Sequence, residues 1–325
     1  MQEASAYLAP HRLDDALQAM ADGDATVLCG GTDLTPQTDS GVRQYKATLL
    51  NIRRIEGLGG IDASGDEIRI GATTTVSEIR RNATLAELAP ALVQAAEHFA
   101  SEQLRNAASV GGNLCNASPA SDMSPPLLVL DASVELACWR DGAVQTRRVP
   151  LERFFLAPRK TAMRPQELLT AVVFARPAAD FVSRFRKAGP RPALEISTVS
   201  VALGARLAGG RLGAVRVAMG SVAATPLRAR HVEAALEGKP LDAATILAEA
   251  RRPGRLVVVA ENHSAVGGLG EAVASLLLQE GVAPARFRML ALPDAFLDAG
   301  ALPTLHDRYG ISTAKVTESL KAWLA

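Results

Sequence analysis

Cysteine and histidine are scarce in this chain, and neither occurs in a spacing that binds a metal. The 325 residues include three cysteines and five histidines. The cysteines are scattered at positions 29, 115 and 138, which excludes both a disulfide framework and a cysteine-ligated zinc site. An iron–sulfur cluster needs a closely spaced group of thiolates, which this sequence lacks. We therefore expect a reduced protein with no metal centre of its own.

Long apolar runs and an excess of charge of one sign are also missing. No stretch reaches the roughly 18 consecutive apolar residues of a membrane-spanning helix, and the N-terminus lacks a basic segment followed by an apolar run. The formal net charge is +1, which gives no electrostatic reason to expect binding to nucleic acid or to an acidic membrane. We expect a soluble, cytoplasmic protein whose partners include neither.

The composition is that of a folded chain with several domains. Hydrophobic residues make up 48% of the sequence and charged residues 21%, which is enough to bury substantial cores. A chain of 325 residues is expected to hold two or three domains. The segment Pro177–Asp180 is a candidate boundary between two of them.

Two glycine-rich segments are the most informative feature of the sequence. They are Cys29-Gly-Gly-Thr-Asp-Leu34 and Ser109-Val-Gly-Gly-Asn-Leu114. Paired glycines allow positive φ and a close approach of the backbone to a ligand, and successive N–H groups there can surround an anion. Two such loops on one domain predict a clamp for the pyrophosphate of a dinucleotide. Each segment alone is explained equally well as a tight turn with no ligand.

The residues around both segments resemble the FAD-binding medium subunits of the molybdenum hydroxylases, which include carbon monoxide, xanthine and aromatic-heterocycle dehydrogenases. Val27–Pro36 is similar to the first flavin loop of that family, and Leu104–Asn106 with Ser109–Asp122 is similar to the second. The resemblance extends from about residue 5 to about residue 245. Further similarity lies in Lys160–Ala162, Leu168-Leu169, Phe185–Lys187 and Ile196-Ser197.

The resemblance implies FAD as the cofactor. It assigns the first loop to the pyrophosphate and ribityl chain, Asp122 to the adenosine ribose, and Leu169 to a ring of the cofactor. The full set of cofactor-binding residues that it implies is Val27, Leu28, Cys29, Gly30, Gly31, Thr32, Asp33, Leu34, Phe99, Ser109, Gly111, Gly112, Asn113, Ser118, Asp122, Leu169 and Lys187. Taken singly, Phe99 is more typical of a core residue and Asp122 of a helix cap. Because the flavin itself carries the electrons, we expect no catalytic side chain.

The fold implied is an α+β FAD-binding domain of the two-lobed type (vanillyl-alcohol-oxidase or PCMH-like) at residues 1–176, with lobes 1–55 and 56–176. A truncated α+β flavoprotein C-terminal domain would follow at 177–248. Sequence patterns predict helices at 13–20, 88–100 and 228–236, and strands at 26–28, 48–52, 67–71, 133–138, 144–149, 167–174, 197–207 and 212–219.

Residues 249–325 resemble a different family, the C-terminal domain of transketolases. The similarity lies in Glu261–Gly270, in Leu292–Asp294 and in Tyr309–Ile311. A small α/β unit is predicted, with strands at 255–260 and 287–290 and helices at 271–279 and 314–324. Glu261 and His263 would lie at a strand end where ligands bind in such sheets. The Gly-Asp-Gly signature of thiamine enzymes is absent from the sequence, so we do not expect thiamine catalysis.

The chain therefore resembles a flavoprotein subunit fused near residue 248 to a transketolase tail. The flavoprotein resemblance implies electron transfer from [2Fe–2S] clusters to NAD⁺, a quinone or oxygen. It also implies two partners, an iron–sulfur small subunit and a molybdopterin large subunit, in a heterotrimer or a dimer of heterotrimers. The alternative is a folded but inert relic that binds FAD and has lost its docking surface.

Overall fold

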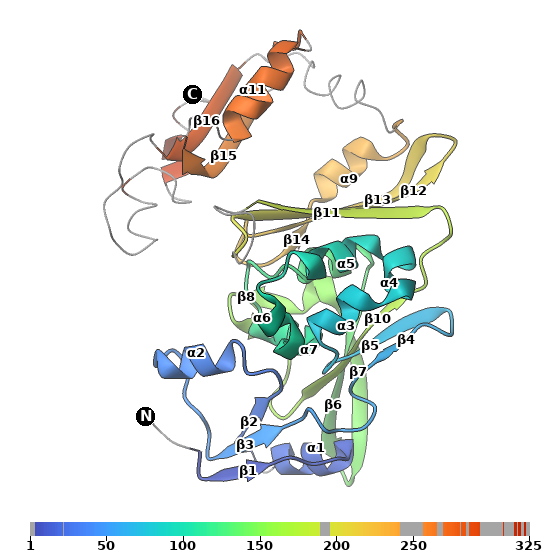
Figure 1. The fold of residues 1–325 in the computed structure, drawn as a ribbon, viewed down its shortest axis with the longest axis vertical. Coiled ribbons are helices and arrows are strands. Elements are labelled where there is room, and N and C mark those ends of the chain that lie inside the picture. Colours follow the sequence, from blue (N-terminus) through green and yellow to red (C-terminus); the bar gives the residue numbers. More distant parts are fainter. Residues whose placement is uncertain are drawn as a thin grey trace. The chain divides into compact units, whose positions relative to one another are not determined.

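The computed structural model describes residues 4–188 except Asp22, residues 196–240, and beyond these the segments 256–264, 269–279, 281–283 and 286–292 with a few isolated positions (Figure 1). The chain divides into two compact units, Met1–Gly238 and Lys239–Ala325. In the described residues, no helix is long and apolar enough to cross a membrane.

The first lobe of the larger unit is a parallel sheet in the order β1-β3-β2. Its strands are β1 (Ala6–Leu8), β2 (Ala25–Leu28) and β3 (Thr48–Asn51). The helix α1 (Leu13–Ala21) connects β1 to β2 and buries Ala16, Leu17 and Met20 on one face. This spacing places the apolar side chains on the same side of the helix, against the core. The short helix α2 (Leu34–Asp39) follows the first glycine segment.

The second lobe contains a five-stranded sheet in the order β4-β5-β10-β6-β7, with every neighbouring pair antiparallel. The strands are β4 (Ile61–Asp62), β5 (Glu67–Gly71), β6 (Ser133–Arg140), β7 (Ala143–Pro150) and β10 (Leu168–Ala175). Asp141 and Gly142 both have positive φ in the β6–β7 turn, as the Asp-Gly signal predicts. The segment η1 (Leu151–Arg153) and the pair β8 (Phe155–Ala157) and β9 (Lys160–Thr161) connect β7 to β10.

The second lobe also contains six short helices, and two of them correct the sequence prediction. They are α3 (Val76–Arg81), α4 (Ala83–Leu88), α5 (Pro90–Glu97), α6 (Glu102–Ala107), α7 (Val110–Asn116) and α8 (Ser124–Val129). The predicted single helix at 88–100 is wrong at both ends. The chain leaves helical geometry at Ala89, as expected for a residue before proline, and the helix from Pro90 ends at Glu97. Thr75 is the N-cap of α3 and forms a capping box with Glu78.

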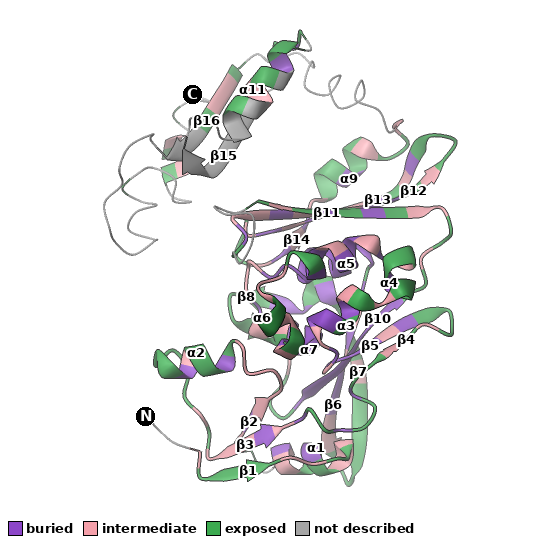
Figure 2. Cartoon of the chain, viewed as in Figure 1, coloured by how far each residue is buried: buried purple, intermediate pink, exposed green. Residues whose placement is uncertain are grey.

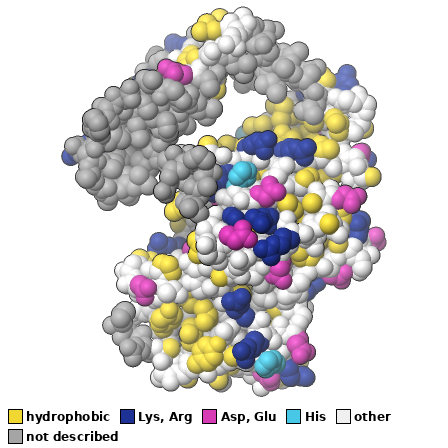
Figure 3. Space-filling model, in the orientation of Figure 1, with side chains coloured by type: hydrophobic (Ala, Val, Ile, Leu, Met, Phe, Trp, Pro, Cys, Tyr) yellow, Lys and Arg dark blue, Asp and Glu magenta, His cyan; other side chains and the backbone are white. Residues whose placement is uncertain are grey.

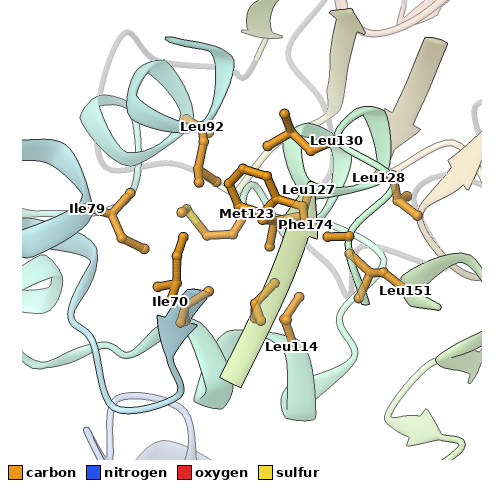
Figure 4. Packing of buried hydrophobic residues seen from close by; sticks show 14 of the residues in the cluster. Ile70, Ile79, Leu92, Leu114, Met123, Leu127, Leu128, Leu130, Leu151 and Phe174 are labelled. Atoms are coloured by element: carbon orange, nitrogen blue, oxygen red, sulfur yellow. The ribbon is translucent and has the colours of Figure 1, made fainter. Parts of the chain in front are cut away.

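The main hydrophobic core lies between this sheet and its helices (Figure 4). Phe174 enters it from β10, Leu92 from α5 and Leu114 from α7, and all three side chains are almost fully buried. Seven of the eight residues of β10 are buried, which is typical of a central strand covered on both faces (Figure 2). Leu114 is important for the site because, together with Val110, it fixes α7 in this core.

A third part of this unit is the antiparallel sheet β11-β12-β13-β14. Its strands are β11 (Phe181–Ala188), β12 (Val199–Ala208), β13 (Arg211–Gly220) and β14 (Leu227–Arg228), and α9 (Arg230–Leu236) packs on β13. Buried Arg228 joins this sheet to the second lobe, because its guanidinium donates to the Leu128 carbonyl and to Asp131 Oδ1. The predicted strands and helix of this region are confirmed.

The smaller unit contains β15 (Leu256–Ser264), α11 (Leu269–Gln279) and β16 (Arg286–Leu292). The two strands pair in parallel, with Leu256 opposite Arg286. This confirms the predicted strand–helix–strand pattern. Of the predicted closing helix at 314–324, the described positions 315, 316, 318, 319 and 322 are helical. The side chains of Glu261 and His263 lie outside the described residues.

On the face shown in Figure 3, lysine and arginine side chains are interspersed with acidic ones over the second lobe. Apolar side chains gather over the first lobe (Figure 3). Tyr7 and Val42 are exposed there, at 59% and 52%.

Candidate functional site

A cavity of about 360 Å³ lies between the first and second lobes, and both glycine segments line it. This volume falls within the range of small-molecule binding sites. The first lobe contributes residues from Ala25 to Ile52, and the second contributes residues from Ala72 to Leu169. Both glycine segments therefore line one cavity.

The first glycine segment turns the chain from β2 into α2 in direct contact with the second lobe. A Cβ atom on Gly30 would lie 2.1 Å from the carbonyl oxygen of Ala107. No side chain fits there, so Gly30 is required by the contact of two backbones. Gly31 has φ +73°, a conformation that favours glycine.

The first segment also presents unused hydrogen-bond donors. Among the described residues, none accepts a hydrogen bond from the backbone N–H groups of Gly31, Thr32 or Asp33. All three residues line the cavity. Consecutive N–H groups around a left-handed residue form a concave binding surface for an anion. A wall of this kind can bind an anionic group.

The second glycine segment is helical, which corrects its interpretation as a loop. Ser109 is the N-cap of α7, and Gly111 and Gly112 lie in the first turn of the helix. The N–H groups of Val110 and Gly111 donate to the carbonyls of Thr74 and Ala72 at 3.0 and 2.9 Å, and that of Gly112 donates to Ser109 Oγ at 3.1 Å. These donors are used within the protein. The segment forms a wall of the cavity but is not a second set of free N–H groups.

Gly111 is required by packing. A Cβ atom there would lie 2.8 Å from both the carbonyl oxygen and the Cβ of Ala72. Ser109 Oγ is used within the protein, because it accepts from the Gly112 N–H and forms a hydrogen bond with the Cys29 thiol. The group of this wall that remains for a ligand is the side chain of Asn113. Asn113 accepts a hydrogen bond from Ser121 Oγ through Oδ1 at 2.6 Å, which leaves its amide NH₂ as a donor.

Most other residues of the predicted set also line the cavity. Leu169 is 2% exposed at the cavity wall, and Phe99 contacts both the main core and the cavity. The remaining predicted residues that line it are Val27, Cys29 and Leu34. Leu28 is not part of the lining.

Asp122, Lys187 and Ser118 lie apart from this lining. Lys187 Nζ contacts Asp122 Oδ2 at 2.6 Å in a nearly buried ion pair, and Ser197 Oγ donates to the same carboxylate. Ser118 Oγ accepts a hydrogen bond from the Ala120 N–H at 3.2 Å. Asp122 is also not the cap of α8, whose N-cap is Met123. The assignment of these three residues to the cofactor stays a prediction from resemblance.

Several residues that line the cavity were not predicted from the sequence. The main ones are Gln37, Arg43, Gln44, Lys46, Cys115, Asn116, Met163 and Glu167. Gln37 Nε2 donates to Asn116 Oδ1 at 2.9 Å and so joins α2 to α7. The sequence contains one indication of them, which is their nearness to predicted residues. They follow the first glycine segment, follow the second glycine segment, or precede Leu168-Leu169.

Ionisable groups of the wall have shifted pKa values. Burial raises the pKa of Asp33 and of the Cys29 thiol. Burial also raises the pKa of Cys115, which opens onto the cavity, to about 12, against a lowering by the charge of Arg43. Both thiols therefore stay protonated near neutral pH and are poor nucleophiles.

Glu167 is the anchor of the wall that carries Met163 and Leu169. Its carboxylate accepts two hydrogen bonds from Arg147, at 2.6 and 2.7 Å, and one from the Arg164 N–H at 2.6 Å. Burial alone would raise the pKa of Glu167, but these donors outweigh it and lower the pKa below its usual value.

Three family models match the chain. Residues 2–177 match the FAD-binding domain in molybdopterin dehydrogenases, 184–262 the C-terminal domain of carbon monoxide dehydrogenase flavoprotein, and 235–316 the C-terminal domain of transketolase. The xanthine dehydrogenase FAD-binding subunit of Escherichia coli O157:H7 is 33% identical over 249 residues, which cover 76% of this chain and 84% of that protein.

Solved structures support the same family for the flavoprotein part of the chain. Carbon monoxide dehydrogenase from Hydrogenophaga pseudoflava matches with a TM-score of 0.71 and 28% identity, over 77% of this chain and 86% of that one. Quinoline 2-oxidoreductase from Pseudomonas putida 86 matches with a TM-score of 0.70, the same identity and the same coverage. The chain belongs to the family of FAD-binding domains of molybdopterin dehydrogenases. It is an FAD-dependent oxidoreductase subunit of the xanthine and carbon monoxide dehydrogenase type.

The tail has a separate relative. A putative uncharacterized transketolase family protein of Sinorhizobium fredii, y4mN, is 69% identical over 86 residues. These are 26% of this chain and 25% of that protein, so the chain spans a quarter of this relative.

The contact of Gly30 with the second lobe predicts the effect of a single methyl group. Gly30→Ala places a Cβ against the Ala107 carbonyl, so the first glycine segment must move. We expect FAD affinity to fall about tenfold or more. The ratio of flavin to protein after purification, and titration of the apoprotein with FAD, measure this. Gly65→Ala is the matched control, because nothing lies within 4 Å of its added Cβ. Equal flavin content in both variants would contradict the packing role of Gly30.

The ion pair of Glu167 leads us to predict that the difference in stability between the wild type and Glu167→Gln depends on pH. Because the pKa of Glu167 is lowered in the folded state, its ionised form stabilises the fold above its unfolded pKa, and this stabilisation is lost as the pH falls through the folded value. Glu167→Gln should cost about 2 kcal/mol near neutral pH and much less in acid. Thermal unfolding of the wild type and the variant across pH measures the difference. A difference that does not change with pH would contradict the ion pair. Glu67→Gln, which removes an exposed partner of Arg148, is the control and should change little.

Proposed function

We propose that the chain is the FAD-carrying electron-transfer subunit of a molybdenum hydroxylase complex. In this role it accepts electrons from the [2Fe–2S] clusters of a small subunit and passes them to NAD⁺, a quinone or oxygen. The observation that carries the proposal is the cavity between two lobes, with free N–H groups at Gly31–Asp33 on one wall and α7 on the other. The family membership gives the same cofactor.

The protein's part in this reaction is binding and orientation. Bound FAD supplies the redox chemistry, since a flavin exchanges single electrons with clusters and electron pairs with acceptors. The N–H groups of Gly31, Thr32 and Asp33 hold the pyrophosphate, and Asn113 offers its amide from the wall formed by α7. Leu169 and Phe99 give an apolar wall for a ring system and exclude water from it. No step requires an acid or base on the chain.

The proposed partners are an iron–sulfur small subunit and a molybdopterin large subunit. Two relatives support a complex through their names. They are the glyceraldehyde dehydrogenase medium chain of Sulfolobus acidocaldarius, 31% identical over 237 residues, and subunit alpha of the 6-hydroxypseudooxynicotine dehydrogenase complex of Paenarthrobacter nicotinovorans, 31% identical over 169 residues. The large subunit would select the substrate.

The tail favours a second candidate, an FAD-binding protein that no longer docks with partners. The flavoprotein match at 184–262 overlaps the transketolase match at 235–316, so the chain passes from one family to the other within 235–262. We propose domains at 1–176, 177–248 and 249–325. In the second candidate, the transketolase-like tail replaces the end of the flavoprotein C-terminal domain that docks with partners.

Co-purification distinguishes the two candidates. The tagged full-length chain should be expressed with its native neighbouring subunits and isolated. We expect bound FAD, a complex that contains iron–sulfur and molybdenum subunits, and reduction of an acceptor with a heterocyclic or aldehyde substrate. Bound FAD without partners or turnover would support the second candidate. A chain that binds no FAD at all would overturn both.

A further inference from the structure

Arg43 places a positive charge at the FAD cavity without a protein partner. It lies between α2 and β3, is exposed, and lines the cavity. In the part of the chain that the structure describes, no carboxylate or carbonyl pairs with its guanidinium, whereas most other arginines of the two lobes have such a partner. The group is available to a ligand.

The surroundings of Arg43 place it where the two lobes face each other. Its backbone N–H donates to the Gln37 carbonyl at 3.0 Å, which holds it beside α2. Gln37 reaches Asn116 on α7, and the charge of Arg43 lowers the pKa of the neighbouring Cys115. The guanidinium therefore lies within electrostatic reach of α7, on the opposite wall of the cavity.

The other charged side chains of the wall are bound to protein groups or would repel an anion. Lys46 Nζ donates to the Gly23 carbonyl at 3.1 Å, and Glu167 is paired with Arg147. Asp33 is an acid whose carboxyl finds no basic partner among the described residues. A pyrophosphate at the N–H groups of residues 31–33 would lie beside this acid and needs a compensating cation. Among the lining residues that the structure describes, Arg43 is the cation whose side chain makes no hydrogen bond to the protein, whereas Lys46, also charged, is held at the Gly23 carbonyl.

We propose that Arg43 binds the pyrophosphate of FAD and so makes this site select the charged dinucleotide over uncharged riboflavin. The inference rests on FAD as the cofactor. A guanidinium forms two parallel charge-assisted hydrogen bonds to phosphate oxygens, and its geometry suits them better than that of an ammonium group. Backbone N–H groups hold the anion from one side and Arg43 neutralises it from the open side.

The test compares FAD with riboflavin on the full-length apoprotein. Arg43→Gln should weaken FAD binding about tenfold, the loss expected for a hydrogen-bonded charge, and leave riboflavin binding unchanged. Arg43→Lys, which keeps the charge, should lose less. The dependence of FAD affinity on salt should be shallower in Arg43→Gln than in the wild type. Arg140→Gln is the control, because Arg140 is exposed at the β6–β7 hairpin away from the cavity.

Three results would overturn the proposal. One is an unchanged FAD affinity in Arg43→Gln. Another is an equal loss for FAD and riboflavin, which would indicate a structural role for Arg43. The third is a loss of the same size in Arg140→Gln. A wild-type chain that binds no FAD would instead contradict the proposed function itself.

Discussion

The site depends on two places where the backbones of different segments touch. Gly30 leaves no space between the first lobe and the Ala107 carbonyl, and Gly111 leaves none between α7 and Ala72. Ala107 and Ala72 both belong to the second lobe, so the two contacts place the first glycine segment, α7 and β5 in one fixed arrangement. Because neither contact involves a side chain that could adjust, the distance between the cavity walls is set by main-chain atoms.

The two glycine segments differ in what their backbone N–H groups do. The N–H groups of α7 are used to attach the helix to Thr74 and Ala72, so the second segment builds the wall. In the first segment, the N–H groups of Gly31, Thr32 and Asp33 have no acceptor among the described residues, so they can bind the anion. Both walls are held from further away, α7 by Leu114 in the main core and Leu169 by the strand that follows Glu167. The two glycine segments are similar in sequence, but the first is suited to bind a ligand and the second to pack against the protein.

The sequence predicts the parts of this structure whose causes are local. The strand at 67–71, the Asp141-Gly142 hairpin and the Thr75 cap follow from alternation, turn chemistry and capping. The helix at Val110–Asn116 was missed because two glycines disfavour a helix by about 1 kcal/mol each, and because carbonyls distant in sequence, those of Thr74 and Ala72, hold its first turn. The Asp122–Lys187 pair joins residues 65 positions apart. Arg43 belongs to no sequence motif, and it can be recognised as a candidate ligand-binding residue only once the two lobes are packed around the cavity.

The central claim is that the first glycine segment binds the anionic part of FAD while the second only forms the facing wall. A crystal structure of the full-length chain with FAD tests it most directly. The account predicts that the pyrophosphate oxygens accept hydrogen bonds from the N–H groups of Gly31, Thr32 and Asp33, and that the bonds from Val110 and Gly111 to Thr74 and Ala72 remain. A pyrophosphate bound to the N–H groups of Val110–Gly112, with those bonds broken, would contradict it.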